Sequence, residues 1–179
     1  MHARLAETMT FVEEKRRELL QSFDGVSGDR LCRRAAPDGW SVAEIIEHLR
    51  MVESGVARLI TKRVSQAREA GLGEEKSTTS VMPSFDTHRA RLDSGVMKSP
   101  SMVQPRANVD ISEALEGLES SREALRAAVV TADGLALGEI KHDHVVLGEL
   151  DLYQWLIFLG HHENRHKKQI ERTLKSIPE

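Results

Sequence analysis

The sequence predicts an all-α protein built as a four-helix bundle. A segment without sustained periodicity, residues 72–109, divides the chain, and no strand alternation of useful length appears. Helices of about 20–30 residues span about 30–45 Å, and this segment is long enough to return along that length. We therefore expect a long crossover between helices 2 and 3, which allows these two helices to be parallel. Four stretches repeat their apolar side chains with helical spacing: residues 3–24, 42–70, 111–133 and 152–175.

The first two helices have clear boundaries in the sequence. Gly25 follows the first stretch and is expected to stop its helix. Residues 26–39 are predicted to form a loop. Ser41 can then cap the second helix, with Glu44 reaching back to complete a capping box, and this helix should end near Ala70. The apolar residues that define the two helices are Leu5, Met9, Val12, Leu19, Leu20 and Phe23, followed by Val42, Ile45, Leu49, Val52, Val56 and Leu59.

The helices in the second half of the chain are also marked by capping residues and apolar stripes. The crossover is rich in Ser, Thr and Pro, with one short helix expected near residues 85–92. Asp110 and Asp151 are each followed three residues later by Glu or Gln, which predicts two more capped helix starts. Residues 135–150 are expected to form a structured loop or an extended piece. The stripes of the last two helices are Ile111, Leu115, Leu118, Leu125 and Val129, then Leu152, Trp155, Leu156, Leu159, Ile170 and Leu174.

Size and composition restrict the class of protein. The 179 residues fit one domain, residues 1–179, with a single core. No apolar run approaches the length of a membrane span. A net charge of −3 and 4% aromatic residues argue against nucleic-acid binding. With Cys32 as the one cysteine and no signal peptide at the N-terminus, we expect a cytoplasmic protein.

Histidines interrupt two of the apolar stripes. In the last helix, His162 and His166 fill inward positions between Leu159 and Ile170, at a spacing that puts both imidazoles on one face. In the second helix, His48 lies on or beside the stripe. Burying an imidazole without a partner costs about 1–3 kcal/mol, and a shared metal ion would satisfy all three. A single inward histidine more often bonds a carbonyl or a carboxylate, so both interpretations remain open from the residues alone.

The same region matches the zinc-protease pattern H-E-x-x-H, with Glu163 in the position of the general base. Such enzymes take a third ligand from beyond the helix that carries the pair. Only the continuation of one helix follows His166. The third ligand available lies upstream, at His48, so the sequence does not favour a protease.

Two segments resemble the DinB/YfiT-like superfamily. PDGWSVAEIIEHLRMVE, residues 37–53, is similar to the G-W-[ST]-x-x-E-x-x-x-H-L entry into helix 2 of the family. HDHVVLGELDLYQWLIFLGHHENRHKKQIERTL, residues 142–174, is similar to its long pattern ending in H-x-x-R-H-x-x-Q-I. His144-Val145 departs from the usual His-Pro, and Gln169 matches the Gln of the motif. The residues around KSPSMVQP, 98–105, resemble the family more weakly.

This resemblance implies an up-down-down-up bundle and a metal triad of His48, His162 and His166. It also implies a metal-dependent transferase in which a divalent ion, zinc or nickel, activates a low-molecular-weight thiol towards a small-molecule substrate. The alternatives are a metal-dependent hydrolase and a non-enzymatic metal-binding bundle of the stress response. Homodimers are common among such proteins. Gln169 is expected either to hydrogen-bond a metal-binding histidine or to have a plain structural role.

Overall fold

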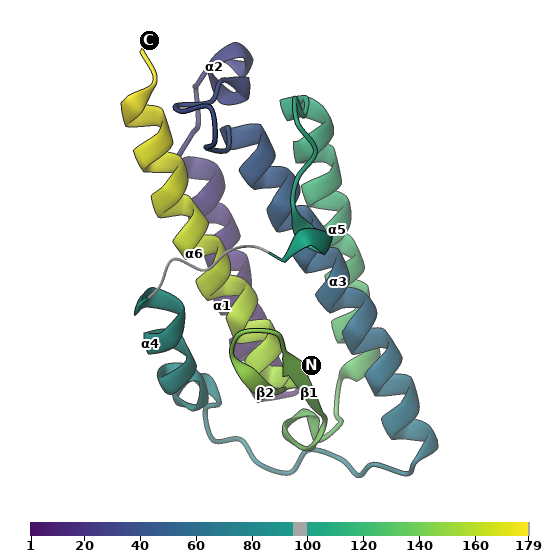
Figure 1. Ribbon diagram of the computed structural model, residues 1–179. Coiled ribbons are helices and arrows are strands. Elements are labelled where there is room, and N and C mark those ends of the chain that lie inside the picture. Colours follow the sequence, from purple (N-terminus) through teal and green to yellow (C-terminus); the bar gives the residue numbers. More distant parts are fainter. Residues whose placement is uncertain (95–99, 179) are drawn as a thin grey trace.

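Four long helices form the body of the protein in the computed structural model, which describes residues 1–94 and 100–178. The helices are α1 (Ala3–Gln21), α3 (Val42–Glu69), α5 (Ile111–Ala132) and α6 (Leu152–Ser176). α1 and α6 run towards one end of the bundle, and α3 and α5 run towards the other (Figure 1). The main packing partners are therefore parallel, α1 with α6 and α3 with α5. This confirms the predicted four-helix bundle and its order.

The helix starts are set by the capping residues that the sequence predicts. Ser41 and Glu44 form a complete capping box at α3. Asp151 and Gln154 form another at α6. Asp110 caps α5 through the backbone N–H groups of Ser112 and Glu113, but no reciprocal bond closes a box there. The Glu113 carboxylate instead accepts a hydrogen bond from Arg106, at 2.6 Å.

The crossover runs beside the bundle, and its described residues form three short helical pieces. They are η1 (Met82–Phe85), α4 (Asp86–Ser94) and η2 (Ser101–Val103). The expected short helix is thus present, while residues 95–99 of the crossover and part of KSPSMVQP lie outside the described residues. The Phe85 side chain at the start of α4 is buried in the core, which fixes this piece on the bundle.

One prediction about the irregular segments was wrong, and the other was confirmed. The expected loop after α1 contains a short helix, α2 (Gly28–Cys32), whose Leu31 side chain is buried against the core. The segment before α6 contains the turn η3 (Leu137–Glu139) and an antiparallel hairpin of β1 (Lys141–His144) and β2 (Gly148–Asp151). Only Leu150 of the two strands is buried, so the alternation that reveals a strand is almost absent from the sequence.

The bundle core is divided into two apolar layers by a buried polar layer. One apolar layer, near the hairpin, includes Val12, Val56, Leu125 and Leu159; the other, near α2, includes Leu19, Leu49, Leu118 and Ile170. The polar layer between them contains one charged residue from each long helix. These four residues are Arg16, Glu53, Arg122 and Glu163, each at most 5% exposed.

Their charges cancel within the polar layer. Glu163 Oε1 accepts hydrogen bonds from Arg16 Nη2 at 2.7 Å and from Arg122 Nη2 at 2.8 Å. Glu53 accepts from Arg122 Nε at 2.8 Å, from Arg16 Nη2 at 2.9 Å and from the Ser121 hydroxyl at 2.5 Å. Two guanidinium groups and two carboxylates thus pair across all four helices, while Glu163 Oε2 has no hydrogen-bond partner among the described residues.

Close packing of α1 on α6 gives a test of the core geometry. A Cβ atom added to Gly160 would lie 2.4 Å from Phe11 Cε1, inside contact distance. We expect Gly160→Ala to destabilise the fold by about 1–3 kcal/mol, because the Phe11 ring must move. Gly55 has open space around the same position, so Gly55→Ala should be neutral or should stabilise α3 by up to about 1 kcal/mol. Urea denaturation of both variants measures the difference, and equal effects would contradict this packing.

Among the described residues, no helix is long and apolar enough to cross a lipid bilayer.

Candidate metal centre

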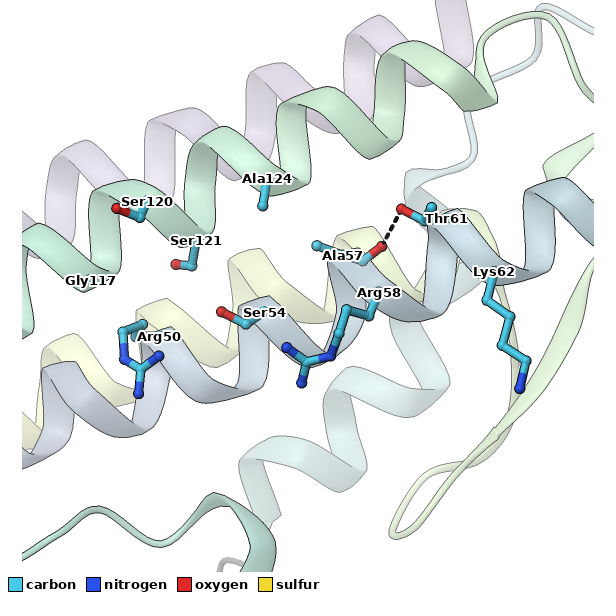
Figure 2. Close-up of a pocket in the computed structure, with 10 residues that line it drawn as sticks. All are labelled: Arg50, Ser54, Ala57, Arg58, Thr61, Lys62, Gly117, Ser120, Ser121 and Ala124. Carbon is cyan, nitrogen blue, oxygen red and sulfur yellow. Dashed lines mark hydrogen bonds between the residues drawn. The ribbon is translucent and has the colours of Figure 1, made fainter.

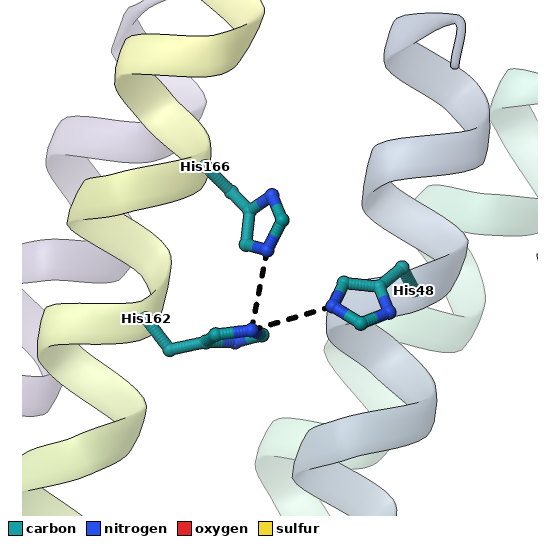
Figure 3. Close-up of side chains that lie close together, drawn as sticks. All are labelled: His48, His162 and His166. Carbon is teal, nitrogen blue, oxygen red and sulfur yellow. Dashed lines mark hydrogen bonds between the residues drawn. The ribbon is translucent and has the colours of Figure 1, made fainter. Parts of the chain in front are cut away.

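Three histidines from two helices meet between α3 and α6. His48 comes from α3, and His162 and His166 come from α6 (Figure 3). The Nε2 atom of His162 lies 3.3 Å from Nε2 of His48 and 3.2 Å from Nε2 of His166. Ligand nitrogens around a tetrahedral zinc ion at its usual bond length are about 3.3 Å apart. The predicted convergence of the three imidazoles is confirmed, at separations that suit one small cation.

The other ring nitrogens of two of these histidines are held by hydrogen bonds. His48 Nδ1 lies 2.7 Å from the Val103 carbonyl oxygen of η2, and His166 Nδ1 lies 2.8 Å from Gln169 Oε1. Both oxygens are acceptors, so each Nδ1 carries the proton and each Nε2 presents a lone pair. Gln169 thus takes the first of its two expected roles. The lone pairs of His48 and His166 both point at His162 Nε2, an arrangement that a shared cation would satisfy.

The triad is neutral because it is buried. The three side chains are buried, and burial lowers the pKa of His48 and lowers that of His162 well below its usual range. Burial also lowers the pKa of His166, to about 3. Metal ligands must be deprotonated, so at neutral pH these imidazoles have the form that binds a divalent ion. Three protein ligands leave room for a further ligand, as in catalytic zinc sites. The residues present therefore fit such an ion.

The triad opens on a cleft of about 1360 Å³ between α3 and α6. Val52 and Leu59, which the sequence assigns to the core stripe, instead line this cleft and are only partly buried. Trp40 packs on the His48 ring and Phe158 packs on the His162 ring, with centroids 5.1 Å apart in both pairs. The walls near the triad are therefore aromatic, which limits the access of water to anything bound there.

His144 in the hairpin turn also lines the cleft. Its Nδ1 atom accepts hydrogen bonds from the backbone N–H groups of Val146 and Leu147, at 3.1 and 3.2 Å. Its ring lies on Phe158, the residue that also contacts His162. Burial lowers the pKa of His144 to about 4, so its proton is on Nε2. His144, which is followed by Val145 where the family usually has proline, is thus a neutral hydrogen-bond donor beside the triad.

Glu163 does not contribute to this site. Its side chain points from the other side of α6 into the polar layer, where it pairs with Arg16 and Arg122. The match to H-E-x-x-H has no general base, and the protease interpretation fails on geometry. His161, between the core and the surface, contacts Phe11 and Phe85 on the flank of the helix.

A second, smaller groove of about 460 Å³ lies between α3 and α5 (Figure 2). It shares no lining residue with the cleft. Its titratable side chains are Arg50, Arg58 and Lys62. The Thr61 and Ser121 hydroxyls are already bonded, to the Ala57 carbonyl and to the Glu53 carboxylate. Among the described residues, no histidine, cysteine or carboxylate lines this groove, so it offers no metal ligand, and we place the chemistry in the cleft.

The neutral state of His144 predicts how the free energy of unfolding depends on pH. Its pKa is about 4 in the fold against about 6.5 when unfolded, so the unfolded chain takes up a proton between these values while the folded chain does not. Stability present above pH 6.5 is therefore lost as the pH falls towards 4, by up to about 1.4 kcal/mol per pH unit. We expect His144→Asn, which keeps an acceptor for the turn, to reduce the slope of unfolding free energy against pH by this amount. Urea denaturation of chelated protein at several pH values measures it, and unchanged slopes would contradict the assignment.

Comparison with known proteins agrees with this architecture. The sequence profile described as the DinB superfamily matches residues 12–170. The chain belongs to the DinB superfamily. A similar relative is "Uncharacterized protein YuaE" of Bacillus subtilis (strain 168), 27% identical over 170 residues that cover 94% of this chain and 98% of the relative. The DinB superfamily assignment thus extends over nearly all of the bundle, including the triad.

A solved structure supports the four-helix-bundle fold. "Crystal structure of TT2238, a four-helix bundle protein" superposes with a TM-score of 0.63 at 19% identity, covering 94% of this chain and 98% of that one. At this identity the likeness concerns the fold alone.

Proposed function

We propose that this DinB superfamily protein is a metal-dependent transferase that acts on small molecules in the cytoplasm. His48, His162 and His166 would hold one divalent ion, zinc or nickel, through their Nε2 atoms. The observation that carries this proposal is the convergence of three buried, neutral imidazoles from two helices at the floor of a cleft. Imidazole accepts several divalent ions, and the choice between zinc and nickel is a matter for measurement.

When bound, the ion would stabilise the thiolate form of a low-molecular-weight thiol, which is the nucleophilic form. The chain would supply the remaining functions. Val103 and Gln169 orient the imidazoles of His48 and His166. Trp40 and Phe158 pack beside the triad and restrict water. His144 presents an Nε2–H donor to the cleft, suited to a polar group of the second substrate.

The product would be a thioether, formed when the sulfur replaces a leaving group on an electrophilic carbon. The first test is the metal content of the protein as purified. The second is incubation of the metal-loaded protein with a thiol and a model electrophile, followed by mass spectrometry of the products. Thioether formation that depends on both the metal and the protein is the expected result.

Two other outcomes would replace this proposal. Hydrolysis of the electrophile without thiol would indicate a metal-dependent hydrolase, since an open metal position also acidifies water. Absence of turnover, combined with a large loss of thermal stability on chelation, would indicate a non-enzymatic metal-binding bundle. The matched control in each assay is His161→Ala, because this histidine is adjacent to the triad in sequence and lies on the flank of α6.

A further inference from the structure

The cleft differs in character on the two sides of the triad. α3 and α6 run in opposite directions (Figure 1), so residues before His48 lie near residues after His166. On that side, the cleft is lined by the loop at 38–40 and by the C-terminal half of α6. On the other side, it is lined by the hairpin and by apolar residues. These apolar residues are Val52, Val56, Leu59, Trp155 and Phe158.

The first side, which we call the cationic arm, has three basic residues of α6. Arg165, Lys168 and Arg172 follow one another at i, i+3 and i+7 and so form one stripe beside the triad. Arg165 Nη1 donates to the Leu92 carbonyl oxygen at 2.8 Å, so this residue is held as part of the wall. Asp38 is the one acidic residue that lines the same arm.

Lys168 and Arg172 are available to a ligand. Both side chains are exposed. Within residues 1–94 and 100–178, neither side chain forms a hydrogen bond or an ion pair, although other surface cations do, such as Lys167 with Glu18 at 3.3 Å. Two cations that line a cleft and have no ion-pair partner among the described residues, in a chain of net charge −3, favour the binding of an anion there.

We propose that the cationic arm binds an anionic oxygen group, carboxylate or phosphate, of the ligand that reaches the triad. The proposal rests on the function proposed above and narrows its thiol to an acidic one. Helical rise places Lys168 and Arg172 about 3–9 Å beyond His166 along the axis of α6. The anionic group is therefore separated from the sulfur by only a few bonds. The other side of the cleft does not suit an anion, since its apolar wall would cost the anion its hydration and Asp143 of the hairpin also lines it. The apolar wall suits the carbon skeleton of the second substrate.

The two tryptophans of the chain provide a direct readout, because Trp40 and Trp155 both line the cleft. We would titrate metal-loaded protein with 3-mercaptopropionate and with 2-mercaptoethanol, which differ mainly in charge, and follow tryptophan fluorescence. In the double variant Lys168→Ala/Arg172→Ala, affinity for 3-mercaptopropionate should fall about tenfold, with 2-mercaptoethanol unchanged. Lys175→Ala, an exposed lysine of the same helix outside the cleft, should change neither.

Equal losses for both thiols, or no loss for either, would overturn the cationic arm. Titration with succinate and with inorganic phosphate, which contain no sulfur, separates this failure from that of the proposed function. Succinate or phosphate binding that depends on Lys168 and Arg172, without thiol binding, would support the arm and contradict the transferase; which anion binds more tightly identifies the preferred group. Thiol binding that requires His48 but is equally tight for 3-mercaptopropionate and 2-mercaptoethanol would support the transferase and overturn the cationic arm. Loss of all binding in the wild type overturns both.

Discussion

Alanine at His162 is expected to abolish stoichiometric metal binding by the purified protein. This imidazole is the central member of the triad, with its Nε2 atom 3.3 Å from that of His48 and 3.2 Å from that of His166. Loss of a residue that only orients a ligand costs about 10–100-fold in metal affinity, so loss of the ligand itself should cost at least about 100-fold. Metal analysis after dialysis, and competition with a chromogenic chelator, measure the effect. His48→Ala and His166→Ala should behave alike.

Two control variants make this prediction specific. Gln169→Ala removes the acceptor that holds His166 Nδ1, so it should weaken metal binding by about 10–100-fold and retain the site. His161→Ala should leave metal affinity unchanged, because the ring packs between Phe11 and Phe85. Full metal content in all three triad variants would show that the ion binds elsewhere, and the proposed function would then fail.

Arg122→Ala is expected to destabilise the fold by about 3–5 kcal/mol, more than Gly160→Ala does. The Arg122 side chain is 0% exposed and joins Glu53 and Glu163. Its removal leaves two buried carboxylates with only Arg16 as a cationic partner in the polar layer. Guanidinium denaturation followed by circular dichroism measures the change.

Arg126→Ala is the matched control for this variant. Arg126 lies one turn further along α5, pairs with Glu13 and is 47% exposed, so its loss should cost less than about 1 kcal/mol. Removing a charge of each sign tests the mechanism further. The double variant Arg122→Met/Glu53→Gln should be less destabilised than the sum of the single variants by at least about 1 kcal/mol. Strict additivity would mean that the charges do not interact as the geometry indicates.

Much of the fold follows from local patterns in the sequence. Ser41 with Glu44, and Asp151 with Gln154, mark helix starts because each capping box depends on residues three positions apart. The triad was a candidate from the residues, since His48, His162 and His166 interrupt apolar stripes and buried imidazoles need partners; the family resemblance then selected it. The long crossover implied the parallel arrangement of α3 with α5.

Other features depend on contacts between distant parts of the chain. Arg16 lies four residues after Val12 and three before Leu19, on the buried face of α1. The identity of its partners could not be predicted, because Glu53 and Glu163 meet it only after three helices pack. The same holds for Val103, whose carbonyl orients His48 from 55 residues away. The extended piece before α6 was expected, but its pairing as a hairpin was not, because its sequence buries a single strand residue.

The polar layer also fixes the positions of the four helices relative to one another along the bundle axis. Contacts between apolar side chains are not directional, so sliding one helix past another replaces one set of apolar contacts by another at a modest cost in free energy. A displacement of one turn, about 5.4 Å, would instead separate the guanidinium groups from the carboxylates. The charges would then be buried among apolar side chains without partners. Glu163 is the immediate neighbour of His162, and Glu53 follows His48 by little more than one helical turn. The polar layer therefore also sets the axial position at which the three imidazoles face each other.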